Sequence, residues 1–152
     1  MHLLLSAWIY FGWRKVWARF PILGRIVYPD ISGKWDMEIN WTGPKKNQSG
    51  IAKAQAIIKQ DFLRLSMDVN ADNSESCTLM AAPRKHPESG EPQLYYVYSV
   101  TTKPQNGYLS ETYQGSAILR FDQSAGGQIS GNYWTSKHTS GHFRLFNKEP
   151  DK

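Results

Sequence analysis

The chain has 152 residues, a formal net charge of +5 and a single cysteine, Cys77. This length allows one compact domain with an appendage. A single cysteine excludes an internal disulfide, and we expect Cys77 to be a buried side chain and not a reactive thiol. The charge is uneven: residues 1–29 carry four basic residues and no acidic one, whereas the remaining 14 basic and 13 acidic residues nearly cancel. This balance argues against a nucleic-acid-binding surface on the globular part, so we expect no DNA or RNA polymer as a partner.

The first element is the apolar run from Leu3 to Trp13. It is about 11 residues long, which at about 1.5 Å per residue is too short to cross a hydrocarbon core of about 30 Å. Aromatic and cationic residues follow it, an order typical of the cytoplasmic end of a spanning helix. We expect residues 1–29 to be a membrane-proximal helix and linker, helical over Leu3–Trp17. It forms part of a transmembrane anchor or lies flat in the interface; the alternative is a helix packed on the protein itself.

From residue 30 onward the hydrophobic pattern has a period of two, which is typical of strands. In 33–41, for example, Trp35, Met37 and Ile39 alternate with polar residues. Turn signals separate this stretch from seven others of the same kind. The expected strands are 33–41, 51–59, 62–69, 75–82, 93–101, 112–122, 128–135 and 140–146.

Eight antiparallel strands joined by short turns predict an all-β fold, an eight-stranded up-and-down barrel that is lipocalin-like, because closure removes exposed edges. A two-sheet sandwich is the alternative. The expected barrel covers residues 30–147, and residues 148–152 are expected to form a disordered tail. Five large residues are expected inside: Trp35, Leu65, Leu119, Tyr133 and Phe143.

Small residues in the expected inward phase indicate that the barrel has room for a ligand. Alternatively, they only make space for large aromatic rings from the opposite wall. These small residues are Ala52, Ala54, Ala56, Ala81, Gly115, Ala117, Gly131 and Gly141.

In an up-and-down barrel the turns after the first, third, fifth and seventh strands meet at one end, away from the point where the chain enters. Inward aromatic side chains and a hydroxyl, ringed by loop lysines, suit a small anionic ligand with flat rings. The alternative is that these lysines are only solvated. The candidate ligand-binding residues are Trp41, Lys45, Lys46, Tyr98, Lys103, Tyr113, Thr135 and Lys137.

Signals of catalysis are weak in this chain. His138 and His142 lie four apart in an expected turn and strand, where that spacing does not form a helical metal-binding pair. No Gly-x-Ser-x-Gly elbow and no glycine-rich phosphate loop opening a helix is present. We therefore expect no enzyme activity, no metal site and no cofactor.

Three stretches resemble a known family. They are 20–39, with the sequence FPILGRIVYPDISGKWDMEI, and the closing patterns ISGNY at 129–133 and TSGHFRL at 139–145. They are similar to the β-barrel effectors of bacterial CBASS antiphage systems, which carry two transmembrane helices and a cyclic dinucleotide receptor domain. The start Gly33-x-Trp35 also occurs in lipocalins, so a lipocalin-like binder of a small apolar ligand at the cytoplasmic membrane face stays open as an alternative, as does a purely structural barrel.

The resemblance implies antiviral defence. A cyclic dinucleotide second messenger would bind the barrel and drive the anchored protein to form a homo-oligomer that contacts and disrupts membrane lipids. The protein would lie in the bacterial inner membrane with the barrel facing the cytoplasm. The family is expected to have both spanning helices, of which this sequence contains at most part of the second.

Overall fold

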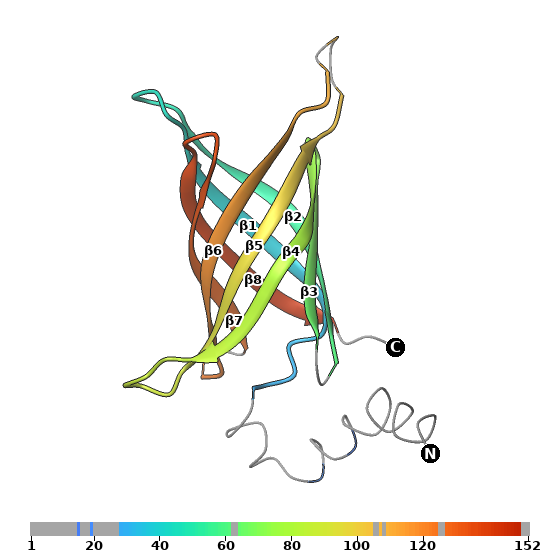
Figure 1. Ribbon diagram of the computed structural model, residues 1–152, viewed down its shortest axis with the longest axis vertical. Coiled ribbons are helices and arrows are strands. Elements are labelled where there is room, and N and C mark those ends of the chain that lie inside the picture. Colours follow the sequence, from blue (N-terminus) through green and yellow to red (C-terminus); the bar gives the residue numbers. More distant parts are fainter. Residues whose placement is uncertain are drawn as a thin grey trace.

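The computed structural model describes residues 15, 19, 28–61, 64–104, 107, 109–124 and 127–149. Eight strands form a closed antiparallel barrel in which each strand pairs with its neighbours in sequence and β8 closes on β1 (Figure 1). The strands are β1 (Gly33–Thr42), β2 (Ser49–Gln60), β3 (Leu65–Ala71), β4 (Ser74–Lys85), β5 (Pro92–Thr102), β6 (Thr112–Asp122), β7 (Gln128–Thr135) and β8 (Ser140–Glu149). The predicted eight-stranded up-and-down barrel is confirmed.

The chain before the barrel was expected to be helical over 3–17, and that segment lies outside the described residues except for Lys15. Within the described part of the chain, we find no helix with the length and apolar character needed to cross a bilayer. At the other terminus, β8 runs two residues beyond the expected barrel end at 147.

The core of the barrel follows the predicted alternation. All five residues expected inside, Trp35, Leu65, Leu119, Tyr133 and Phe143, are buried. On β1, buried Trp35 and Met37 alternate with exposed neighbours, because successive side chains of a strand point to opposite faces. Period-two patterning therefore decided which residues form the core.

The prediction that Cys77 is buried is wrong, because its side chain is exposed. The inward positions of β4 near it are polar, and a bulge between Thr78 and Met80 shifts the register of β4 against β5. Thr78 lies at the β3–β4 seam, where its Oγ1 accepts from the N–H of Met67 (2.8 Å) and donates to the C=O of Met67 (2.9 Å). The hydroxyl-bearing residues Ser76 and Thr78 thus occupy the inner face of β4, and Cys77 between them points outward.

The segment before β1 closes one end of the barrel. Ile31 is fully buried, and its backbone C=O accepts a hydrogen bond from Nε1 of Trp35 at 3.0 Å. Gln60 at the end of β2 holds the same segment twice, since its Oε1 accepts from the N–H of Ile31 (3.0 Å) and its Nε2 donates to the C=O of Pro29 (3.2 Å). This end is therefore plugged, and a ligand must enter elsewhere.

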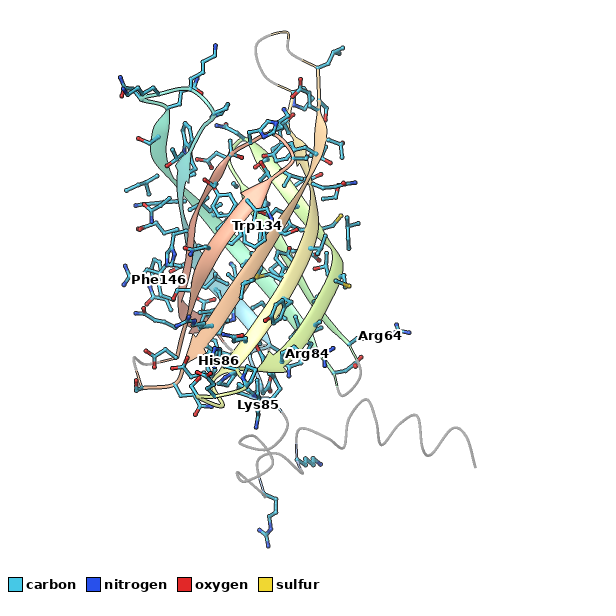
Figure 2. All side chains as sticks on the ribbon, turned by 60° about the vertical axis from the view of Figure 1, so that its left-hand side comes forward. Arg64, Arg84, Lys85, His86, Trp134 and Phe146 are labelled. Carbon is cyan, nitrogen blue, oxygen red and sulfur yellow. The ribbon has the colours of Figure 1, made fainter. Side chains whose placement is uncertain are left out.

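The two ends of the barrel are formed by different turns. Arg64, Arg84, Lys85 and His86 lie at the plugged end, where the chain enters (Figure 2). The hairpin turns β1–β2, β3–β4, β5–β6 and β7–β8 lie at the opposite end (Figure 1). That opposite end contains the mouth of the cavity described next.

Candidate ligand-binding site

The barrel encloses a cavity of about 600 Å³ that extends from Met37 in the interior to Asp72, Asn73 and Thr139 at the turn end. Small-molecule sites typically measure roughly 300 to 1,000 Å³ and combine an apolar wall with a few polar groups. The cavity therefore has the size and position of a ligand site, open at the end away from the entering chain.

Four aromatic rings form a nearly continuous wall of this cavity. Tyr96 and Tyr98 on β5 are stacked, with centroids 4.8 Å apart and planes 18° apart. Tyr133 on β7 and Phe143 on β8 are stacked at 4.1 Å and 11°. Tyr98 and Phe143 join the two pairs at 6.0 Å in a tilted arrangement. A flat ring entering the cavity would find aromatic faces and edges around it.

Glycines on the neighbouring strands make room for these rings. Gly115 pairs with Tyr98 in the β5–β6 register, and a Cβ at Gly115 would lie 2.4 Å from Cζ of Tyr98. Gly141 on β8 pairs with Trp41 on β1, and a Cβ there would lie 1.8 Å from the backbone oxygen of Asn40. Both positions therefore require glycine, for the ring in one case and for close strand approach in the other.

The cavity tyrosines are uncharged at neutral pH. Burial raises the pKa of Tyr98 far above its ordinary value, and it raises the pKa of Tyr96 and of Tyr133 to about 12. The hydroxyl of Tyr96 donates to the backbone C=O of Met67 at 2.6 Å. The wall thus offers neutral aromatic surface, which does not repel an anionic ligand.

The cavity also opens sideways, because two hairpins differ in length. β2 pairs with β3 only from Ala54 opposite Ala71 onward, although its pairing with β1 continues to Ser49. Residues 49–53 of β2 therefore have a strand on one side alone. Ile51 and Lys53 belong to this stretch and line the cavity, although both side chains are exposed.

Residues 26–147 match the sequence model of a family described as Cap15, cyclic dinucleotide receptor domain. The chain belongs to this family. It is also 27% identical over 144 residues to the CD-NTase-associated protein 15 of Staphylococcus schleiferi, an alignment that covers 93% of this chain and 74% of that protein. The predicted resemblance to cyclic dinucleotide-sensing effectors of CBASS defence is confirmed, and the chain carries a cyclic dinucleotide receptor domain.

Four of the eight candidate residues line the cavity of this Cap15-family domain: Trp41, Tyr98, Tyr113 and Thr135. Near the mouth, Oγ1 of Thr135 and Oγ1 of Thr139 are hydrogen-bonded at 2.5 Å. The structure therefore brings four of the predicted residues, one threonine and three aromatic residues, together around the same cavity.

The other four candidates, all lysines, stand at the turn end outside the cavity lining. Lys45 and Lys46 are exposed in the β1–β2 turn. Nζ of Lys103 donates to Oδ1 of Asn70 and to the backbone C=O of Ala71, both at 2.7 Å.

Lys137 forms an ion pair with Glu111 and places Nζ 4.9 Å from the ring centroid of Tyr113. Lys103 and Lys137 thus already have partners in this Cap15-family structure.

The structure adds cavity residues that were not among the sequence candidates. Tyr133 and Phe143 were expected as core but not as ligand contacts, and both line the cavity. Among the described residues that line the cavity, Lys53 is the only cationic one. Alternation along β2 directs its side chain outward, so only the unequal hairpin lengths could have placed it here. Within the described ranges, no group of three or more His, Cys, Asp or Glu side chains could hold a metal ion.

Proposed function

We propose that this receptor domain binds its cyclic dinucleotide inside the barrel cavity, with the bases among the aromatic rings and the phosphates toward the turn end. The observation that carries the proposal is the cavity of about 600 Å³, walled by Tyr96, Tyr98, Tyr133 and Phe143 and open opposite the plugged end. Stacking of a base on an aromatic side chain contributes about 1 to 3 kcal/mol. Enclosed rings are therefore the main source of affinity.

The charges needed for two phosphates lie at the mouth. Lys53 lines the cavity, and Lys45 and Lys46 are exposed on the β1–β2 turn beside it. Lys103 and Lys137 already have hydrogen-bonded partners. They therefore act on the phosphates through their positive electrostatic potential more than through direct hydrogen bonds. Exposed ammonium groups are screened over about 8 Å at physiological ionic strength, so they act mostly on the association rate.

We further infer that the barrel is held at the bacterial inner membrane with its cavity mouth facing the cytoplasm. The chain enters at the plugged end, where Arg64, Arg84 and Lys85 gather (Figure 2). Cationic side chains near a membrane are attracted to anionic lipid headgroups. This orientation turns the mouth away from the bilayer and toward dissolved nucleotides.

Ligand binding in the barrel is proposed to act on the anchored chain, so that liganded copies form a homo-oligomer that disrupts membrane lipids. The segment 29–31 is hydrogen-bonded to β1 and β2 by Trp35 and Gln60. These hydrogen bonds connect the barrel to the segment that enters it, as a receptor that signals toward its anchor requires. The protein is a receptor and effector with no catalytic step of its own.

Thermal unfolding in the presence of ligands tests the proposal. The probes are cyclic di-AMP, cyclic di-GMP and cyclic GMP-AMP, with linear dinucleotides as controls and a fatty acid as an apolar probe. At least one cyclic dinucleotide should raise the unfolding temperature, because a ligand that binds only the folded state stabilises it. Stabilisation by the fatty acid alone would favour the lipocalin-like alternative, which the apolar side chains of Met37, Val69 and Val100 in the lining would suit.

A further inference from the structure

The uncovered edge of β2 presents backbone groups to the cavity. In an antiparallel ladder, alternate residues direct their N–H and C=O toward opposite neighbouring strands. The N–H of Gly43 donates to the C=O of Gln48 at 2.7 Å, so Gln48 faces β1, and so do Gly50 and Ala52. Ile51 and Lys53 must then face the other way.

The hydrogen bonds at the other end of β2 independently show to which side the backbone groups of Ile51 and Lys53 point. The N–H of Asp61 donates to the C=O of Arg64 at 2.9 Å, so Asp61 faces β3. Residues at even separations from Asp61 face the same side, and the β1–β2 register shows no shift in between. Ile51 and Lys53 are at such separations, but β3 has ended by then, so no strand in the described part of the chain pairs with them on this side.

We propose that one nucleobase of the cyclic dinucleotide is recognised at this edge by the backbone C=O of Ile51 and the backbone N–H of Lys53. These two groups are adjacent on one edge of the strand and form an acceptor and donor pair. Each nucleobase carries a neighbouring donor and acceptor on its Watson–Crick edge. The match is therefore between two complementary pairs in one plane.

Three features around the edge favour a nucleobase as the occupant. Ile51, Ala52 and Lys53 all line the cavity, so the edge is reached from the ligand space. The indole of Trp41 lies against Gly50, where a Cβ would be only 3.0 Å from Nε1, and supplies an aromatic surface next to the edge. Lys53 lines the cavity beside this edge and adds a cation on the side where the proposed function places the phosphates.

Backbone recognition makes the site sensitive to the base edge and insensitive to side-chain replacement. A buried donor or acceptor that loses its partner is costly, so a base with a blocked edge is rejected. This inference rests on the proposed function, since it assigns a base position within the same cavity. It adds a specificity element that no side-chain substitution would reveal.

The test compares three variants of the whole chain by calorimetry, using whichever of cyclic di-AMP, cyclic di-GMP and cyclic GMP-AMP binds best. Lys53→Pro removes the donor and the charge, whereas Lys53→Ala removes the charge alone. Ser49→Pro removes an N–H on the same uncovered edge, at a position outside the cavity lining. Proline is tolerated where a strand N–H has no ladder partner, so the three should fold alike.

We expect Lys53→Pro to bind about tenfold more weakly than Lys53→Ala, and Ser49→Pro to bind like the parent. An analogue methylated at the base edge should bind the parent weakly, and Lys53→Pro should no longer distinguish it from the unmodified ligand. On the parent protein, hydrogen exchange of the Lys53 amide should slow when the ligand is added, a readout that does not depend on any variant folding.

Equal binding by Lys53→Pro and Lys53→Ala, with unchanged exchange at Lys53, would overturn the inference while leaving the proposed function intact. The same holds if Lys53→Pro abolishes a concentration-dependent dimer without changing ligand affinity, because the edge then pairs with a strand of a second copy. Failure of every cyclic dinucleotide to bind the parent would instead remove the proposed function.

Discussion

The ring of Tyr98 on β5 lies against the backbone of Gly115 on β6, so closely that a Cβ at Gly115 would be 2.4 Å from Cζ of Tyr98. The two residues are directly paired across the strands. The space left by a missing side chain on one strand is thus filled by an aromatic ring from the next. This contact orients the ring that joins the two stacked pairs of the cavity wall.

Gly115→Ala should therefore destabilise the barrel and displace Tyr98. Overpacking a core position typically costs about 1 to 3 kcal/mol in the free energy of unfolding. Urea unfolding measures this cost, and ligand affinity should fall at the same time because the ring moves. Ser116→Ala, at the next position on β6, is the matched control. Equal stability of the two variants would mean that Tyr98 can move aside freely.

Trp35 plugs the end of the barrel, with 1% of its surface exposed. Trp35→Ala should lower the free energy of unfolding by about 3 to 5 kcal/mol, because the substitution leaves a cavity and removes the hydrogen bond to Ile31. Trp134, which is 49% exposed on the outer face of β7, provides the control Trp134→Ala. A comparable loss from both tryptophans in chemical denaturation would argue against a plug.

Gln60 connects β2 to the segment that leads into the barrel. Gln60→Glu keeps the size and the acceptor for the N–H of Ile31 but removes the donor to the C=O of Pro29. Leaving a partly buried acceptor without its partner should cost about 1 to 3 kcal/mol locally. Hydrogen exchange at Ile31 and Ser32 should become faster, while exchange in β5 and β6 stays the same. Exchange at Ile31 and Ser32 that is as slow in Gln60→Glu as in the parent would contradict this role of Gln60.

The buried tyrosines predict loss of stability at alkaline pH. Burial raises the pKa of Tyr133 to about 12, above the value of about 10 of an unfolded tyrosine, so the folded state favours the neutral form. The resulting stability is fully present below about pH 10 and is lost as pH rises toward 12. Tyr133→Phe should lose less stability between about pH 10 and 12 than the parent does. Identical pH profiles of unfolding for the two proteins would count against a buried Tyr133.

The eight strands were predictable because alternation of apolar and polar residues is strong in each of them, as in Trp35, Met37 and Ile39 of β1. The candidate aromatic residues Trp41, Tyr98 and Tyr113 were predictable for the same reason. Up-and-down topology places strand ends together without knowledge of any side-chain contact. Pattern and topology together identified the end of the barrel at which the cavity opens.

The features that could not be predicted from the sequence depend on the relative lengths of neighbouring strands and on local irregularities within a strand. Cys77 lies on the outward face of β4 with the exposed Leu79, whereas Ser76 and Thr78 occupy the inner face. The side opening exists because β3 ends at Ala71 while β2 continues to Ser49 on the β1 side, and no periodicity encodes that difference. Lys53 joined the cavity lining for that reason. The partners of Lys103 and Lys137 likewise follow from contacts between distant turns.

Calorimetric titration of Tyr98→Leu against the parent measures whether the aromatic rings of the cavity bind a cyclic dinucleotide. Leucine keeps the position apolar and filled while removing the ring, and Trp134→Ala on the outer surface serves as the control for unspecific effects. We expect Tyr98→Leu to bind at least about tenfold more weakly than the parent, consistent with the stacking free energy of one base, and Trp134→Ala to bind normally. Unchanged affinity in Tyr98→Leu, with the variant folded as the parent is, would contradict the account.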